Sequence, residues 1–500
     1  MSAARHGMTA ALALAVGACA VGPDFQRPAP PDAEHYTGDK TEARPITGGG
    51  EAQRFTAGGD IPAQWWELYQ SPALNRLCEQ ALKSNPGIDA AKAALRQAAE
   101  LRKAQWTAFL PTVTGGASLT RNKTATSSVA SAATLPNGGL PPTVFNFYSA
   151  ELDLTYVPDI FGGNRRAYET TEAQEENARF QLEAADLTLT GNVIGTAVAE
   201  ASLRAQIAAT ERLVAVQKEL THVTSEQRGI GAAGGLDLLA QEAAEAQTEA
   251  TLPPLQKQLE ITRDSLTALI GHLPDQPPED EFRLDGLALP HELPLSLPSK
   301  LVEQRPDIRA AEASLHAATA QVGVAVAAML PQFSITANTG STGFQAGQLF
   351  TPGYGFWTLG TNLSQTLFDA GALLHKRRAA DAAMDQAAAQ YRSTVIGAFQ
   401  NVADTLHSLQ ADATGLEADQ QAERAAKAAF EIAQRQYRLG TISHVALLNA
   451  EVTELQAALI LVQAQAARLT DAAGLFQALG GGWWNRPEET AGQPSARSGE

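Results

Sequence analysis

The sequence predicts an α+β fold built from two repeats, with four β-strands and long coiled-coil helices in one chain of 500 residues. Three observations predict it: an internal repeat, a heptad pattern along two very long helical stretches, and short stretches in which apolar and polar residues alternate. The composition agrees, because alanine is frequent and aromatic residues make up only 6%. Such a composition suits long, closely packed helices better than a broad globular core.

The internal repeat sets the organisation of the chain. Residues 85–95 match residues 305–315 without a gap, at an offset of 220, and the match continues to the Leu-Pro pairs at Pro111 and Pro331. Farther along, residues 231–242 match residues 440–451 at an offset of 209. The stretch at 274–298 is rich in proline and acidic residues, which is typical of a linker.

Each copy predicts the same order of elements. A helix of roughly 35 to 40 residues ends at the Leu-Pro pair, and two strands, a very long helix and a shorter helix follow. The long helices are expected at about 165–228 and 373–439, and at 1.5 Å per residue each is roughly 100 Å long. Their apolar and small residues recur at heptad spacing, which indicates helices packed side by side. The spacing alone leaves open a free-standing two-helix coiled coil or a larger helical barrel.

The strands indicate the environment. Tyr148 to Tyr156 alternates apolar residues with polar ones that include Glu151 and Asp153. Trp357, Leu359, Leu363 and Leu367 alternate in the same way in the second copy, and shorter partner strands lie near 113–119 and 333–337. A soluble sandwich could alternate similarly. Strands of about ten residues, aromatic ends and a polar opposite face favour a membrane β-barrel, with Glu151 and Asp153 as lumen-facing charges that tune cation preference.

Four strands are too few to close a barrel, because about eight is the lower limit. An open sheet edge in lipid leaves backbone groups unpaired at a cost of several kcal/mol each. The chain is therefore expected to oligomerise. Two copies would give eight strands, and three would give twelve, which is wide enough for a channel.

The N-terminus is typical of a targeting segment. Arg5 and His6 precede an apolar run from Met8 to Val16, and Gly17-Ala18 precedes Cys19. The stretch resembles the lipobox of bacterial lipoproteins, which implies that Cys19 is lipidated and becomes the first residue of the mature chain. An ordinary secretory signal with an incidental cysteine is the alternative.

These patterns divide the chain into six expected segments. They are a lipoprotein signal peptide at 1–18, an N-terminal anchor and extended segment at 19–70, the first repeat at 71–273, the inter-repeat linker at 274–298, the second repeat at 299–480 and a flexible C-terminal tail at 481–500.

Several function classes are disfavoured. A net charge of −17 argues against a nucleic-acid partner, and two cysteines cannot build a disulfide scaffold or a four-cysteine zinc site. The sequence has no G-x-S-x-G or Walker A motif, so we expect no enzyme, cofactor or metal site. Residues 229–234 spell G-x-G-x-x-G, but no strand precedes them, and they are interpreted as a connection between two helices of a hairpin. Cys78 is interpreted as a small buried apolar residue.

Taken together, the chain resembles the outer membrane factors of the TolC superfamily, in their lipid-anchored NodT-like branch. The resemblance rests on residues 19–25, on residues 65–77, on both Leu-Pro pairs and on residues 437–449. It implies a homotrimer with a twelve-strand β-barrel in the outer membrane of a Gram-negative bacterium, continuous with a periplasmic α-helical barrel. It implies the exit duct of a tripartite efflux pump that passively conducts drugs or other small molecules. The implied partners are a periplasmic membrane-fusion adaptor, an inner-membrane RND-type transporter or ABC exporter, and outer membrane lipid.

The resemblance also implies a gate at the periplasmic helix tips. Asp237 matches the gate aspartate of the first repeat, and Tyr437 matches the gate tyrosine of the second. Asn449 stands where the family has a ring aspartate, and Ile442 stands where some relatives have an arginine, so a cation-sensitive closure is in doubt. Asp237 could instead cap the helix that follows it.

Two other functions share these features. A type I protein secretion outlet would have the same architecture, and a structural or adhesive coiled-coil surface lipoprotein would share the long helices. The duplication and the polar faces of the strands count against the second of these.

Overall fold

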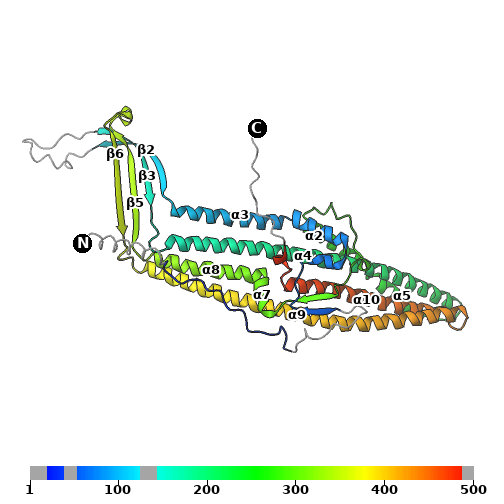
Figure 1. The fold of residues 1–500 in the computed structure, drawn as a ribbon. Coiled ribbons are helices and arrows are strands. Elements are labelled where there is room, and N and C mark those ends of the chain that lie inside the picture. Colours follow the sequence, from blue (N-terminus) through cyan, green and yellow to red (C-terminus); the bar gives the residue numbers. More distant parts are fainter. Residues whose placement is uncertain (1–19, 39–52, 124–143, 487–500) are drawn as a thin grey trace, which may run out of the picture. The chain divides into compact units, whose positions relative to one another are not determined.

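The computed structural model describes residues 20–38, 53–123 and 144–486 (Figure 1). The chain divides into two compact units. A sheet unit comprises residues up to Arg27 together with Arg96–Glu176 and Ala313–Ala389, and a helical unit comprises Pro28–Leu95, Asn177–Glu312 and the residues from Gln390 onward.

The sheet unit contains the four predicted strands. They are β2 (Thr112–Lys123), β3 (Val144–Tyr156), β5 (Gln332–Gly343) and β6 (Gly355–Ser364), hydrogen-bonded in the order β2-β3-β5-β6 with every pair antiparallel. The duplication is visible in β2 and β5, which are twelve residues each at an offset of 220. The prediction was wrong for Leu367, which lies beyond β6 and is 92% exposed. The ladder ends at Ser364 because its partner, Gln332, is the first residue of β5.

The two long helices are confirmed. They are α4 (Gly163–Gly229) and α9 (Ala372–Arg438), each 67 residues long and related by an offset of 209 along their whole length. Much of the predicted heptad seam is buried, as expected for helices packed side by side. The buried residues at the predicted heptad positions are Phe180, Gly191, Ile194, Val198 and Ala201 on α4, and Tyr391, Val395, Ala398, Val402 and Leu409 on α9.

The single helix expected at the start of each copy is broken in both. The first copy has α2 (Pro72–Ser84) and α3 (Pro86–Trp106), and the second has α7 (Pro298–Gln304) and α8 (Pro306–Ala327). The break falls at Asn85 and Arg305, whose ψ angles are 122° and 123°. Each precedes a proline, and the proline ring excludes the helical conformation from the residue before it.

The last helical stretch differs between the copies. The first copy has α5 (Gly235–Glu249) and α6 (Leu252–Leu269), separated near Pro253 and Pro254, whereas the second has one continuous helix, α10 (His444–Ala478). By length and composition alone α10 could cross a membrane, with a mean hydropathy of 1.6. Its C-terminal part instead belongs to the core of the helical unit, where Leu475 and Phe476 are fully buried.

A second, smaller sheet was not predicted. Strand β1 (Arg54–Ala57) pairs in parallel with β4 (Glu292–Leu295), which lies inside the stretch interpreted as a linker. The side chain of Gln53, just before β1, donates from Nε2 to the carbonyl of Pro290 at 2.8 Å. Short 3-10 turns complete the described chain at Trp65–Tyr69 (η2), Thr107–Phe109 (η3), Leu284–Gly286 (η5), Ala346–Phe350 (η6) and Trp483–Asn485 (η7).

Aromatic packing inside the helical unit surrounds Trp65, whose ring stacks on that of Phe476 with centroids 5.3 Å apart. The Tyr69 hydroxyl donates to the carbonyl of Leu469 at 2.9 Å. Cys78 lies fully buried in the same core, as predicted. Burial, with a contribution from Glu79, raises the pKa of its thiol to about 12, so the thiol stays protonated at neutral pH.

The chain beyond residue 480 is ordered for longer than the predicted flexible tail allows. Trp483 Nε1 donates to the carbonyl of Gln304 at 2.6 Å, and Trp484 Nε1 donates to Asp60 at 2.9 Å. Arg486 contacts the carboxylates of Glu183 and Asp186, both at 2.9 Å. Residues 481–486 are therefore a docked segment, and the rest of that expectation, 487–500, lies outside the described residues.

Candidate functional site

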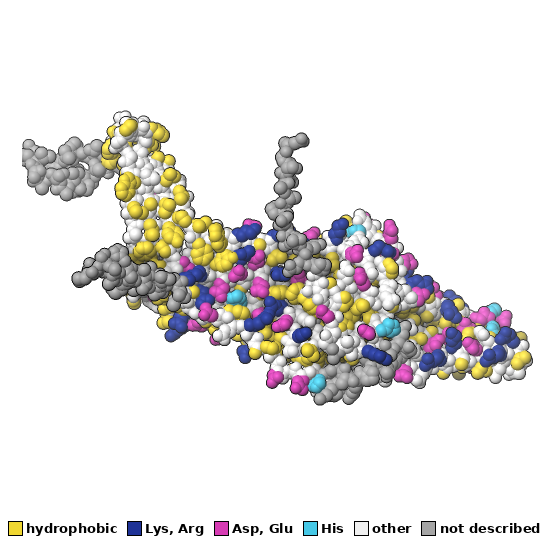
Figure 2. All heavy atoms as spheres, viewed as in Figure 1, with side chains coloured by type: hydrophobic (Ala, Val, Ile, Leu, Met, Phe, Trp, Pro, Cys, Tyr) yellow, Lys and Arg dark blue, Asp and Glu magenta, His cyan; other side chains and the backbone are white. Residues whose placement is uncertain are grey.

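One face of the four-stranded sheet is mainly apolar on all four strands. The register places Val113, Leu154, Ala337 and Leu359 opposite one another on four successive strands. Directly opposed residues point to the same side of a sheet. Trp357, Leu359 and Leu363 on β6 are 65–78% exposed, and Figure 2 shows hydrophobic side chains along the strands while charged side chains gather over the helices. A face of this kind suits contact with hydrocarbon.

The other face is polar and carries the two predicted charges. Thr114, Asp153, Asn338 and Thr358 form one row across the four strands. The structure brings Glu151 and Asp153 together through Asn338, whose amide donates to both carboxylates, at 3.2 Å to Glu151. The sequence interpretation missed Asn338, although its place on the polar face of β5 could have been found by aligning the strands.

The sheet has two open edges, formed by β2 and β6. Every residue of β2 is exposed, and β6 is exposed along most of its length. Such edges leave one row of backbone N–H and C=O groups of each strand without a strand partner among the described residues.

Two helical tips share one backbone design. Helix α4 turns into α5 through residues 230–234, and α9 turns into α10 through residues 439–443. Gly231 and Gly440 adopt left-handed φ angles of 76° and 73°. The amides of Ala232 and Thr441 donate back to the carbonyls of Gln227 and Gln436 at 2.7 and 2.9 Å, which is a Schellman closure in each tip. The G-x-G-x-x-G stretch therefore joins two helices, as interpreted from the sequence.

The three predicted gate residues lie at or near these tips. The Asp237 carboxylate is exposed and accepts a hydrogen bond from the Gly234 amide at 2.9 Å, so it caps the first turn of α5. The Tyr437 ring stacks on His444 at 5.1 Å and is 41% exposed. Asn449 is exposed one turn into α10, and Ile442 is half-buried in the connection before it.

The two tips pack against each other. A hydrophobic cluster, here called the tip cluster, joins α4 to α10 through the buried residues Val216, Leu220, Leu448 and Leu455. The sequence interpretation missed this cluster, because α4 and α10 are far apart in the chain. Cys19, the predicted lipidation site, lies outside the described residues.

The chain matches a known protein family over most of its length. Residues 77–272 and 297–481 match the family described as Outer membrane efflux protein. The probable efflux pump outer membrane protein TtgC of Pseudomonas putida is 28% identical over 98% of each chain. The pyoverdine export outer membrane protein OpmQ of Pseudomonas putida is 30% identical, over 85% of this chain and 89% of its own.

Solved structures show the same fold. The outer-membrane channel OprN matches with a TM-score of 0.81 and 29% identity, over 93% of this chain and all of its own. The outer membrane protein VceC of Vibrio cholerae matches with a TM-score of 0.74 and 27% identity, over 85% of this chain and all of its own.

The fold and the apolar sheet face thus define an outer membrane channel protein. The chain belongs to the outer membrane efflux protein family. The resemblance to the outer membrane factors of the TolC superfamily is confirmed, as are the efflux function and the outer membrane location. The family is one of channels rather than enzymes.

Proposed function

We propose that three copies of this chain close a twelve-strand barrel and form the exit duct of a tripartite efflux pump. The observation that carries this proposal is a four-stranded sheet with two open edges and one face that is mainly apolar on all four strands. An edge exposed to hydrocarbon costs several kcal/mol per unpaired backbone group. Pairing β2 of one copy with β6 of the next removes both edges.

Cross-linking tests this closure. Cysteines introduced together as Val113→Cys on β2 and Leu363→Cys on β6 should join neighbouring copies through a flexible bismaleimide and give dimer and trimer bands. The matched control is Leu154→Cys with Ala337→Cys, which are directly opposed within one chain and should leave a monomer band. A monomer band from both pairs, with a monomeric mass in detergent, would overturn the closed trimer.

The gate is proposed to lie at the helical tips, with Asp237, Tyr437 and Asn449 contributing. Support comes from their positions on two adjacent tips that share the tip cluster. An exposed carboxylate that accepts only one hydrogen bond can bind a second donor, so Asp237 can cap α5 and also contact a neighbouring copy. An asparagine at 449 binds cations more weakly than an aspartate, so closure here is expected to respond little to divalent cations.

Conductance in planar bilayers tests the gate. Asp237→Ala should raise the resting conductance, whereas Glu242→Ala, which removes another exposed carboxylate of α5, should not. Unchanged conductance in Asp237→Ala would limit this residue to capping. Asn449→Asp should introduce a conductance that falls when a divalent cation is added.

The partners are proposed to be a periplasmic membrane-fusion adaptor, docked at the tips, and an inner-membrane transporter of RND or ABC type. Support comes from apolar side chains that the tips expose to solvent, since such patches mark protein interfaces. They are Ile230, Leu236, Leu239 and Leu439, which are 64–81% exposed.

Drug resistance of cells tests whether the adaptor docks at the tips. Leu236→Ser combined with Leu439→Ser should abolish drug resistance while trimers remain in the outer membrane. Leu273→Ser, at a residue that is 68% exposed away from the tips, should leave resistance unchanged. Full resistance in the double variant would place adaptor contacts elsewhere.

Cys19 is proposed to carry a lipid. The support is the lipobox-like sequence that precedes it. Cys19→Ser should remove the acyl mass from the mature chain yet leave trimers in the membrane, because barrel closure buries far more apolar area than a single lipid. Loss of trimers in this variant would contradict that division of roles.

A further inference from the structure

The four described strands of the larger sheet keep opposite charges on opposite faces. They carry four charged side chains, which are Arg121 and Lys123 on β2 and Glu151 and Asp153 on β3. The two acidic residues lie on the polar face, where the amide of Asn338 donates to both carboxylates. The two basic residues, here called the basic pair, lie on the mainly apolar face.

The basic pair lies at one end of that face. Every second residue of a strand points to the same side of the sheet, so Arg121 and Lys123 share the face of Leu119. Strand β2 begins at Thr112, shortly after α3, and ends at Lys123. The basic pair is therefore at the end of β2 that is farther from α3, and both of its side chains are exposed.

Two tyrosines mark the limits of the apolar band on this face. Tyr148 and Tyr156 of β3 are about 27 Å apart along the strand, which is about 21 Å across a membrane at the usual strand tilt of about 40°. An outer membrane barrel has an apolar band about 25 Å tall between two aromatic girdles. Arg121 and Lys123 extend β2 beyond the partner of Tyr148, so the same tilt places them about 26 and 31 Å from the level of Tyr156. Headgroups lie at that level.

Phenylalanines hold the strand end that carries the basic pair. Pairing between β3 and β5 ends at Tyr148, whereas β2 and β3 stay paired as far as Val144. Phe344, directly after β5, packs edge-on against Phe145 and Phe147 of β3, with ring centroids 5.5 and 6.2 Å apart. These contacts fasten the projecting part of β3, and with it the end of β2, to the β5 side of the sheet. The basic pair is thus presented from a paired and packed strand.

We propose that Arg121 and Lys123 bind the phosphate groups of lipid headgroups in the outer leaflet of the outer membrane. The inference rests on the proposed barrel, which places the mainly apolar face in hydrocarbon. A guanidinium binds a phosphate through two parallel hydrogen bonds, and an ammonium binds it as a point charge. Among the described strands, the nearest carboxylate is on the other face. It belongs to Glu151, whose partner Gly116 lies about 17 Å before Arg121 along β2.

The chemistry of the pair selects among headgroups. Two cations on neighbouring positions of one face attract a headgroup that is rich in phosphate. A zwitterionic headgroup offers an ammonium beside its phosphate, and this ammonium is repelled by both cations. The favoured class is therefore a phosphorylated lipid without a balancing amine. Attraction of this kind fixes the level of the sheet in the outer leaflet, in addition to the apolar band.

Lipid binding by the full-length protein in detergent tests the proposal. The probe is fluorescently labelled diphosphoryl lipid A, and its matched control is the same lipid with both phosphates removed. Arg121→Gln and Lys123→Gln should each weaken binding of the phosphorylated lipid about fivefold, the effect of one basic residue at an anionic surface. The two changes together should reduce binding to the level of the dephosphorylated lipid. The difference should shrink at about 1 M salt, where screening acts within about 3 Å.

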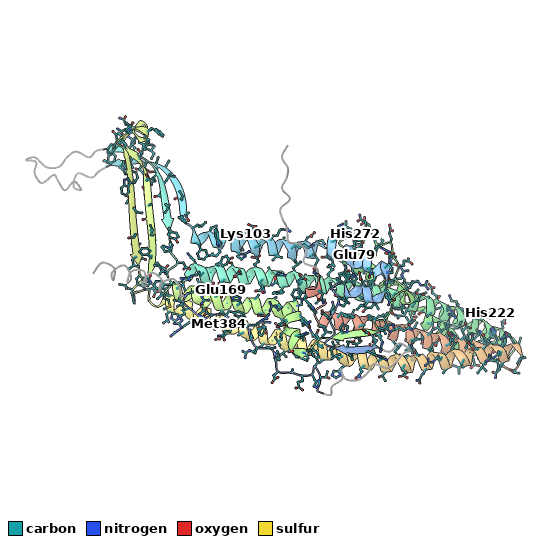
Figure 3. All side chains as sticks on the ribbon, in the orientation of Figure 1. Glu79, Lys103, Glu169, His222, His272 and Met384 are labelled. Carbon is teal, nitrogen blue, oxygen red and sulfur yellow. The ribbon has the colours of Figure 1, made fainter. Side chains whose placement is uncertain are left out.

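Lys103→Gln is the matched control variant. Lys103, labelled on α3 in Figure 3, is an exposed cation of the same sheet unit, but it precedes β2 and pairs with Glu100 at 2.8 Å. Its loss should leave lipid binding unchanged, and an equal loss of binding in this variant would overturn a specific site. Inorganic phosphate at millimolar concentration should not displace the lipid. Displacement would overturn the lipid headgroup as the ligand.

The molecular mass of the same samples separates this proposal from the proposed duct. The expected result is a trimer in both the native chain and the double variant, with a difference in lipid binding alone. A trimeric double variant that binds the phosphorylated lipid as tightly as the native chain would overturn the headgroup site and leave the duct intact. A native chain that is monomeric would overturn the duct, and the placement of the basic pair in the leaflet with it.

Discussion

The α4–α5 tip and the α9–α10 tip have the same turn, but each carries a different half of a helix cap. In the first tip the Asp237 carboxylate accepts from the amide of Gly234, the residue before α5. In the second tip the Ser443 hydroxyl oxygen, at the equivalent N-cap position, accepts from the amide of Ala446 at 3.2 Å. A complete capping box has both halves. Each copy of the repeat has therefore kept the backbone and one of the two side chains.

The tips differ more strongly in what covers their apolar residues. Leu239 and Leu448 occupy equivalent positions at an offset of 209, yet Leu239 is 64% exposed and Leu448 is 5% exposed. Leu448 is covered by α4 through the tip cluster. At this position the duplicated backbone has become asymmetric, because Leu448 is packed within the chain and Leu239 is exposed.

Of the changes considered, Leu220→Ala should have the largest effect, because it removes the packing that covers Leu448. Leu220 is 2% exposed in the tip cluster, and a buried Leu→Ala change costs about 2–5 kcal/mol. Hydrogen exchange at the start of α10 should reveal a lower opening free energy by that amount. Leu239→Ala is the control and should cost less than about 0.5 kcal/mol. Equal losses in both variants would mean that Leu239 is also covered in the assembled protein.

The shared turn can be tested with Gly231→Ala and Gly440→Ala. Both glycines are left-handed, a conformation that costs other residues about 1–2 kcal/mol. No atom lies within 4 Å of a Cβ at either position, so the two losses should be equal and purely conformational. Denaturant titration of each single variant checks this, and a difference above about 1 kcal/mol would contradict the equivalence of the turns.

An acidic pair distinguishes the copies farther along the helices. Asp471 on α10 hydrogen-bonds with Asp412 on α9, whereas the equivalent residues of the first copy, at an offset of 209, are Thr262 and Leu203. Burial, and then the hydrogen bond and charge of Asp412, raise the pKa of Asp471 to about 7. The folded chain therefore holds this proton more tightly than the unfolded chain, in which an aspartate has a pKa near 3.9.

The sign of the pH dependence follows from that difference. The contribution of Asp471 to stability is fully present below about pH 4 and is lost as the pH rises through about 7. The double variant Asp412→Leu with Asp471→Thr copies the residues of the first repeat and should remove this loss. We expect it to stabilise the protein at pH 8 by about 1 kcal/mol, because solvent screening makes the gain smaller than the pKa difference alone would give. Unfolding titrations at pH 5 and pH 8 check this, with Glu417→Gln as the control. A double variant that retains the native pH dependence would contradict the assignment.

How much of this could be predicted from the sequence depends on whether the signal is local. Alternation from Tyr148 to Tyr156 predicted β3 because a pleated strand exposes every second residue to the same side. The heptads predicted the buried faces of α4 and α9 because residues at heptad spacing lie on one side of a helix. The helix breaks also have a local signal, because Pro86 and Pro306 restrict the residue before each of them. The breaks could therefore have been predicted from the sequence.

Other features depend on partners that are distant in sequence. Strand β4 contains Pro294 and is only four residues long, so its identity as a strand comes from β1 rather than from its own residues. The burial of Leu448 against α4 and the hydrogen bonds of Asn338 arise in the same way from distant segments. At the candidate gate, position at a tip could be predicted for Asp237, but its capping bond required the geometry of the Gly234 turn.

The smallest expected effect comes from a substitution that completes the helix cap of the first tip. Gly234→Ser gives that tip the N-cap hydroxyl type of the second, while Asp237 supplies the other half of a capping box. The φ of Gly234 is −84°, which a serine adopts without strain, and the nearest atom to its Cβ is the flexible Asp237 carboxylate at 3.1 Å. Since glycine is already a fair N-cap, the gain should be only a few tenths of a kcal/mol. Hydrogen exchange in the first turn of α5 should slow in Gly234→Ser and stay unchanged in Gly235→Ser, one residue farther along. A faster exchange in Gly234→Ser would mean that the serine displaces the Asp237 carboxylate, and that the two tips use alternative caps that cannot be combined.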